Sequence, residues 1–241
     1  MNIKKHIPNI VTLCNLLCGT LATIFAVDGH FELTAFFVAL GVFLDFFDGF
    51  FARILKVSGE LGKQLDSLAD MVTSGVVPGI VLFSLLGYEK QVMDEFSSFS
   101  AIPLIGLLVT LAACYRLANF NLDSRQSESF IGLPTPAMSL FVVSLPLIQM
   151  HSDIDFIREL IGNTYFLISI SIFFSFLMNS KLHLFSLKFK NYTLRENLFR
   201  YVLIVLSSIF LITMKFLAVP IIILCYLLLS IIKNSMKTKL S

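Results

Sequence analysis

Long apolar runs without charge recur along the chain, and they predict its architecture. A helix needs about 20 apolar residues to cross the hydrocarbon core of a bilayer. Runs of this kind cover residues 7–27, 33–55, 71–88, 96–115, 130–150 and 160–180, the second continuing as apolar helix through two aspartates. The first run is too long for a cleavable signal peptide, so we expect it to remain as a membrane helix.

The C-terminal part has its own pattern. Residues 201–214 and 216–232 are two further apolar runs, separated only by Lys215, with Pro220 near the break. This arrangement predicts a tight terminal hairpin. The preceding segment, 181–200, is the longest polar stretch and is rich in basic residues, which favours a cytoplasmic linker along an anionic membrane surface or a solvated loop.

We therefore predict an all-α, polytopic integral membrane bundle of about eight transmembrane helices. A six-helix transmembrane core occupies residues 1–180, a basic linker residues 181–200, and a two-helix hairpin with a basic tail residues 201–241.

The composition agrees with a membrane location. Hydrophobic residues make up 56% of the chain and charged residues 14%, against roughly 25% charged in a soluble domain. Too few polar residues remain to cover a water-exposed surface. A soluble globule, a disordered protein and a nucleic-acid-binding module are thereby excluded.

Lysine and arginine gather on one side when the predicted spans are threaded with the N-terminus in the cytoplasm. Of the 18 basic residues, only Lys90, Arg158 and Lys215 then lie on the other side. Cytoplasmic loops carry such an excess of Lys and Arg. The pattern predicts a protein of the cytoplasmic membrane with both termini on the cytoplasmic side.

Four carboxylates lie where a bilayer disfavours them. Asp45 and Asp48 fall about 60° apart on one helix face, and Asp66 and Asp70 about 40° apart on another. The segment 57–62 between them is rich in residues that favour a turn. Two antiparallel helices would therefore direct all four acids to one point near the cytoplasmic boundary, and buried acids in membranes are usually functional.

Clustered carboxylates at low dielectric repel one another unless a cation compensates them. Aspartate oxygens select Mg²⁺ or Mn²⁺, and two such ions can hold a diphosphate during phosphoryl transfer. Gly49 and Ala52 would leave room for a flat ligand group, and Arg53 could pair with a phosphate. The alternative is that the acids cap helices or pair with Arg53, Lys56 and Lys63.

The spacing of these residues resembles the signature of the CDP-alcohol phosphatidyltransferases, membrane enzymes of phospholipid synthesis. The matching residues are Asp45, Asp48, Gly49, Ala52, Arg53, Gly62, Asp66 and Asp70. The resemblance implies a six-helix core that binds a CDP-linked lipid, whose diphosphate a dinuclear Mg²⁺ or Mn²⁺ site would hold. An alcohol would then attack and release CMP. It also implies a homodimer.

The resemblance further implies roles for individual residues. The four aspartates would be the metal ligands, and Asp70 would also be the general base for the incoming hydroxyl. Two polar residues in the first helix, Thr12 and Asn15, share a face and either reach the site or hydrogen-bond to a neighbouring helix. The candidate CDP-lipid contacts are thus Thr12, Asn15, Asp48, Gly49, Ala52, Arg53, Gly62 and Asp66.

Two other segments bear on the acceptor alcohol. Residues 116–121 (RLANFN) and 130–137 (FIGLPTPA) resemble the membrane-integral phosphatidylserine synthase branch, which often has Arg where this chain has Asn119. The carboxylate of L-serine requires a cationic partner. Arg116 is one candidate, its alternative role being to reach the membrane surface. The full set of candidate acceptor contacts is Arg116, Asn121, Arg125, Gly132 and Pro134.

The expected partners are therefore CDP-diacylglycerol, L-serine and membrane lipids, with no nucleic acid. Two alternatives stay open. A sister transferase would use glycerol 3-phosphate or inositol as the acceptor. A cation-coupled transporter could also bury carboxylates, but would more often place them at the midplane on broken helices repeated in two halves.

Overall fold

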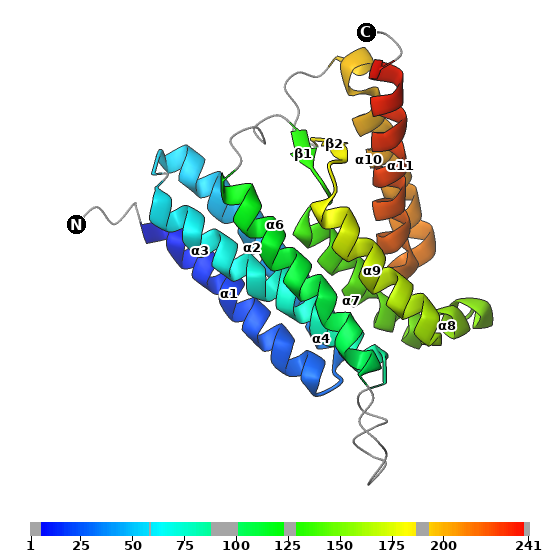
Figure 1. Cartoon of the computed structure of the whole chain (residues 1–241). Helices are drawn as coiled ribbons and strands as arrows, with labels where there is room; N and C mark the ends of the chain where they lie inside the picture. The colour runs from blue at the N-terminus through cyan, green and yellow to red at the C-terminus, as the bar shows by residue number, and fades with distance from the viewer. Residues whose placement is uncertain (1–5, 58, 88–100, 123–128, 187–192, 239–241) are drawn as a thin grey trace.

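The computed structural model describes residues 6–57, 59–87, 101–122, 129–186 and 193–238, and they form a bundle of long helices (Figure 1). The elements before the centre of the chain are α1 (His6–Val27), α2 (Phe31–Leu55), α3 (Glu60–Asp70), the π-helical turn η2 (Met71–Val76), α4 (Val77–Leu85), the 3₁₀ turn η3 (Ile102–Leu107) and α6 (Leu108–Leu122). The later elements are β1 (Ser129–Ile131), α7 (Thr135–His151), α8 (Asp155–Gly162), α9 (Thr164–Asn179), β2 (His183–Phe185), α10 (Leu194–Met214), η5 (Lys215–Leu217) and α11 (Ala218–Thr238).

Several of these helices have the length and composition of membrane spans. Within the described residues five stretches qualify alone: His6–Val27, Phe31–Leu55, Glu60–Leu85, Ile102–Leu122 and Asn197–Met236, the last of which takes in both arms of the terminal hairpin. The bent pair α8 and α9, which meet at 69°, qualifies together as one more. The prediction of an all-α polytopic membrane protein is confirmed.

Two of the helix starts that differ from the prediction bear on the site. The third membrane helix begins at Glu60 rather than at residue 71, because its polar first turns line the acidic cluster instead of facing lipid. The fifth was expected from residue 130, but residues Ser129–Ile131 form a strand that pairs antiparallel with His183–Phe185. Gly132 then adopts a positive φ of 75° and Pro134 leads into α7, so the helix begins only at Thr135.

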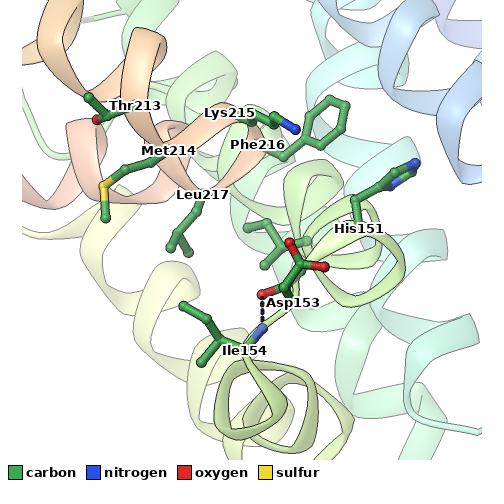
Figure 2. Close-up of a pocket in the computed structure, with 10 residues that line it drawn as sticks. His151, Asp153, Ile154, Thr213, Met214, Lys215, Phe216 and Leu217 are labelled. Atoms are coloured by element: carbon green, nitrogen blue, oxygen red, sulfur yellow. Dashed lines mark hydrogen bonds between the residues drawn. The ribbon is translucent and has the colours of Figure 1, made fainter.

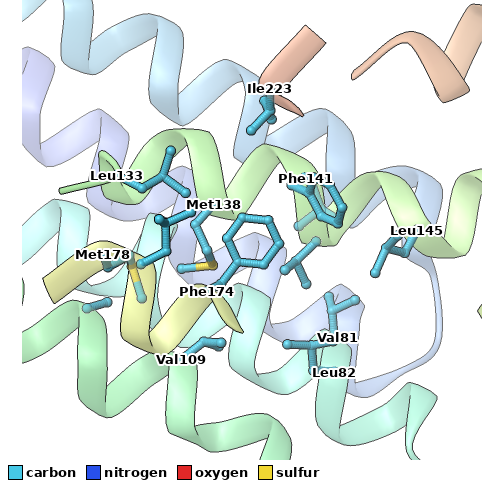
Figure 3. Packing of buried hydrophobic residues seen from close by; sticks show 14 of the residues in the cluster. Val81, Leu82, Val109, Leu133, Met138, Phe141, Leu145, Phe174, Met178 and Ile223 are labelled. Atoms are coloured by element: carbon cyan, nitrogen blue, oxygen red, sulfur yellow. The ribbon is translucent and has the colours of Figure 1, made fainter. Parts of the chain in front are cut away.

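The buried centre of the bundle is α7. Its side chains contact α4 on one side and α9 on another, as the cluster in Figure 3 shows. Phe141 of α7 and Phe174 of α9 lie with ring centroids 4.6 Å apart, and both are buried. This apolar core holds the helices that carry the polar site described below.

The terminal hairpin is present as predicted. α10 and α11 run antiparallel and reverse direction at Lys215 (Figure 1), and Pro220 lies two residues into α11. Strand β2 and the first turns of α10 lie within the segment expected to be a linker, 181–200. α11 packs against α7 and β2, so the hairpin is attached to the rest of the bundle.

Candidate functional site

The two helices that carry the four aspartates do form an antiparallel pair. α2 ends at Leu55, and Lys56 directly after it takes the left-handed conformation (φ 53°) that stops a helix. α3 then begins after Gly59, whose backbone is extended. The reversal brings carboxylate oxygens of Asp45, Asp48 and Asp66 within 4.8 Å of one another.

Asp70 lies beside this trio but is held by a different contact. Asn15 of α1 donates a hydrogen bond from Nδ2 to Asp70 Oδ1 over 3.2 Å. The Asn15 side chain is fixed in turn, because its Oδ1 accepts a bond of 2.8 Å from the Thr73 hydroxyl. Asn15 therefore reaches the acidic site, which was one of the two expectations for it.

Glycines on α1 and α2 let these two helices and η2 approach closely. A Cβ atom on Gly19 of α1 would lie 2.9 Å from the Thr73 backbone nitrogen. A Cβ atom on Gly41 of α2 would lie 2.8 Å from both Asn15 Oδ1 and Thr73 Cγ2. Thr73 belongs to η2, the wide π-helical turn directly after Asp70, and such turns are frequent at functional sites.

Thr12 is the second polar residue of α1 at the site. Its Oγ1 lies 2.5 Å from Asp48 Oδ2 and 3.0 Å from the Pro8 carbonyl oxygen. Both Thr12 and Asp48 are buried. A hydroxyl has one proton to donate, so its bond to Asp48 competes with the ordinary bond to its own helix.

A cavity of about 210 Å³ opens beside the aspartates, between α1, α2 and α3. Six of the predicted CDP-lipid contacts line it: Thr12, Asp48, Gly49, Ala52, Gly62 and Asp66. A Cβ on Gly49 would meet no atom within 4 Å. The glycine therefore faces open space.

Two predicted contacts lie outside this cavity, and five residues that were not predicted as contacts line it. Asn15 sits behind it at Asp70, and the exposed Arg53 donates from Nε to the Gly49 carbonyl oxygen of its own helix over 2.9 Å. The additional lining residues are Pro8, Asn9, Val57, Gly59 and Lys63. Pro8 and Asn9 lie one helical turn before Thr12, and the other three lie in or directly beside the turn between α2 and α3. These positions are the signal that could have identified them.

The predicted acceptor residues divide into two groups. Arg116 is buried and donates from Nη1 to the carbonyl oxygens of Ile131, at 2.8 Å, and Met178, at 2.6 Å. A Cβ on Gly132 would lie 2.8 Å from the same Nη1, and Pro134 precedes α7 nearby. Arg116 thus holds the β1–α7 connection to the end of α9.

The other group lies at the end of α6. Asn121 donates from Nδ2 to Ser67 Oγ over 2.8 Å, and its carbonyl oxygen accepts from Lys63 Nζ over 2.6 Å. Asn121 therefore contacts α3 at Ser67, which directly follows Asp66 and precedes Asp70 by one turn. Arg125 lies outside the described residues.

The donor set fits a divalent metal ion. Three carboxylates converge, one of them buried and two half-buried, and oxygen donors of this kind suit hard cations. Among the residues that the structure describes, none of the four aspartates forms an ion pair with Lys, Arg or His. A group of anions without a protein counterion is the arrangement that a bound cation would stabilise.

The fold and the acidic hairpin define one class of membrane transferase. The family model described as CDP-alcohol phosphatidyltransferase matches residues 5–187, and the chain belongs to that family.

Three relatives carry more particular names. The chain is 35% identical over 145 residues to a CDP-diacylglycerol–serine O-phosphatidyltransferase of Bacillus subtilis (strain 168), covering 58% of this chain and 75% of the relative. It is 30% identical over 207 residues to the protein of that name from Helicobacter pylori (strain ATCC 700392 / 26695), covering 84% and 81%. An archaetidylserine synthase of Methanothermobacter thermautotrophicus is 28% identical over 163 residues, covering 64% and 66%.

Proposed function

We propose that this protein transfers the phosphatidyl group from CDP-diacylglycerol to the hydroxyl of L-serine, giving phosphatidylserine and CMP. The convergence of Asp45, Asp48 and Asp66, with Asp70 alongside, carries the proposal for the chemistry. The names of the relatives support serine as the acceptor. The segment 130–137 and the preceding RLANFN segment support the same choice.

The first part of the mechanism is binding of the nucleotide end of the donor. Asp45, Asp48, Asp66 and Asp70 would hold two Mg²⁺ or Mn²⁺ ions, which neutralise the charge of a diphosphate. The cavity beside them would take part of the CDP moiety, with Gly49 and Ala52 leaving space for a flat group. Thr12 keeps the Asp48 carboxylate directed toward the site.

The second part is attack by the serine hydroxyl. Asp70 accepts the hydroxyl proton at Oδ2, because Oδ1 is already bonded to Asn15. The serine oxygen forms a bond to the phosphorus that carries diacylglycerol, and the bond from that phosphorus to the CMP oxygen breaks. A positively charged group is needed for the serine carboxylate, a role that we assign to Arg116 or Arg125, with Asn121, Gly132 and Pro134 shaping the acceptor side.

The positions of the basic residues support an orientation with the termini and the site on the cytoplasmic side of the cytoplasmic membrane. We also propose that the chain acts as a homodimer, because it resembles a family whose members commonly do so.

We further propose that the chain is divided into a transmembrane core (1–180), a linker (181–200) and a terminal hairpin with a basic tail (201–241).

Release of CMP tests the reaction. Purified protein is incubated with CDP-diacylglycerol, Mg²⁺ or Mn²⁺, and one acceptor at a time: L-serine, glycerol 3-phosphate or inositol. We expect CMP release that depends on serine and on the metal. Release with another acceptor alone would make this chain a sister transferase, and no release with any acceptor would contradict a transferase function.

Asp70→Asn tests the general base. The change keeps the size of the side chain but removes the group that accepts the proton, so we expect turnover to fall at least about 100-fold while CDP-diacylglycerol still binds. Asp28→Asn, an exposed acid in the loop after α1, is the matched control and should retain full turnover. Wild-type turnover by Asp70→Asn would exclude Asp70 as the base.

A further inference from the structure

A second polar cavity, of about 400 Å³, lies at the end of the bundle away from the aspartates. It is formed where α7 ends and where the terminal hairpin reverses. Figure 2 shows Lys215 and Phe216 on the hairpin side of the cavity, with His151 and Asp153 on the α7 side. His151 Nε2 lies 3.0 Å from Glu32 at the start of α2, and Asp45 is roughly 20 Å farther along that helix at 1.5 Å per residue.

An apolar groove of about 400 Å³ continues from this cavity. Phe216 lines both. The groove runs between α2, which contributes Ala35 and Ala39, and the buried side chains of Val143 and Leu147 on α7. Its walls are apolar apart from Glu32 at the mouth and a serine whose hydroxyl already donates to its own helix, so the groove suits a hydrocarbon chain and not a polar ligand.

The polar cavity contains two opposite charges that do not neutralise each other. Lys215 and Asp153 both line it and both are exposed. Within the described ranges neither forms an ion pair. A ligand with an anionic and a cationic group could therefore satisfy both residues at once.

The backbone of Lys215 supports a role for its side chain. Its φ of 49° and ψ of −124° belong to a region that glycine adopts freely and other residues rarely do. A lysine at this position strains the turn. Glycine would form the same reversal with less strain, so the turn alone does not explain a lysine.

We propose that this cavity and groove together bind one phospholipid whose head group carries both a phosphate and a primary ammonium, as in phosphatidylethanolamine. The phosphate lies against Lys215 and the ammonium against Asp153. One acyl chain passes Phe216 and follows the groove between α2 and α7. This site is separate from the acidic cluster and does not depend on the proposed transferase reaction.

Thermal unfolding of the purified full-length protein in detergent tests the proposal. Phosphatidylethanolamine is the probe, and phosphatidylcholine and phosphatidylglycerol with the same acyl chains are the comparison lipids. A ligand that binds only the folded protein raises its Tm, and we expect a rise of about 5 °C for the wild type with phosphatidylethanolamine. The comparison lipids should give less than half of this rise, because choline lacks N–H donors and glycerol lacks a cation.

Lys215→Gly separates the role of the side chain from that of the backbone. It should raise Tm without lipid, because the strain is relieved, and should lose the rise with phosphatidylethanolamine. Lys56→Gly is the matched control, since Lys56 also has a positive φ (53°) but lies at the other end of α2. It should keep the full lipid response.

Two further variants complete the test. Ala39→Phe should fill the groove and reduce the rise in Tm with lipid. Because the Ala39 side chain is exposed, the larger side chain should not disturb the fold. Asp70→Asn should leave the response intact, because the acidic site is not involved. A full response in Lys215→Gly, or an equal response to all three lipids, would overturn the proposal.

Discussion

The Thr12 hydroxyl determines how the buried Asp48 carboxylate is directed. Its oxygen is 2.5 Å from Asp48 Oδ2, and neither residue is exposed to solvent. A group that orients a metal ligand from behind typically contributes 10–100-fold to metal affinity or activity. Thr12 is therefore a positioning residue in the proposed site and not a ligand itself.

Thr12→Val tests this role with little change of shape. We expect the Mg²⁺ concentration for half-maximal CMP release to rise about 10–100-fold, with a smaller change in the KM for serine. Thr12→Ser should restore most of the loss, because it returns the hydroxyl. Thr20→Val is the control, since Thr20 bonds only to a carbonyl oxygen of its own helix. An unchanged metal requirement in Thr12→Val would contradict the positioning role.

At the scale of elements, the contact between α1 and η2 depends on the absence of a side chain at Gly19. A Cβ there would also lie 3.0 Å from Thr73 Cα, which is backbone and cannot move aside cheaply. Thr73 in turn fixes Asn15. Packing of these elements and the geometry at Asp70 are thus connected.

Gly19→Ala should destabilise the protein by about 1–3 kcal/mol, as overpacking in a core does, and should lower turnover through displacement of Asn15. The Tm in detergent and the rate of CMP release are the two measurements. For stability, Gly59→Ala is the matched control, because a Cβ there meets no atom within 4 Å and the backbone is extended. Equal Tm values for both variants would show that the α1–η2 contact tolerates a methyl group.

The terminal hairpin is connected by hydrogen bonds to the candidate acceptor residues. Tyr226 of α11 donates its hydroxyl to the Phe185 carbonyl oxygen over 2.9 Å, and Phe185 belongs to β2. β2 pairs with β1, whose Ile131 carbonyl oxygen accepts from Arg116. The hairpin thereby supports the connection that carries the candidate acceptor residues.

Tyr226→Phe removes this support with minimal loss of packing. We expect the KM for serine to rise about 3–10-fold, since a lost hydrogen bond contributes about 1 kcal/mol, while the KM for CDP-diacylglycerol stays within twofold. Tyr165→Phe, an exposed tyrosine at the start of α9, should change neither. An equal rise in both KM values would instead indicate general loss of stability.

The local elements of the site were predictable and the long-range ones were not. The convergence of Asp45, Asp48 and Asp66 follows from helical spacing on either side of one turn. The partners of Arg116 could not be foreseen, because Met178 is far along the chain and Ile131 lies in a strand whose partner is β2. A strand of three residues is too short to give a periodic sequence pattern, so β1 could not be distinguished from the apolar run 130–150 that overlaps it.

At the scale of the whole molecule, the basic residues and the acidic cluster predict one orientation in the membrane. Glu159 of α8 should face the outside, and Ser235 near the end of α11 the cytoplasm; both are exposed. Single cysteines introduced at these positions, in a variant without the native cysteines, can be labelled in intact cells with a membrane-impermeant maleimide. We expect labelling of Glu159→Cys and none of Ser235→Cys. The reverse result would invert the proposed topology.

The small volume of the chamber beside the aspartates has a consequence for the product. Pockets that enclose a drug-sized molecule measure roughly 300–1,000 Å³, and this one measures about 210 Å³. It has room for part of a nucleotide head and none for fatty tails, which must stay in the surrounding lipid. A transferase with such a site would not select its donor by acyl-chain length or unsaturation. The acyl-chain composition of its product would therefore match that of the CDP-diacylglycerol available in the membrane.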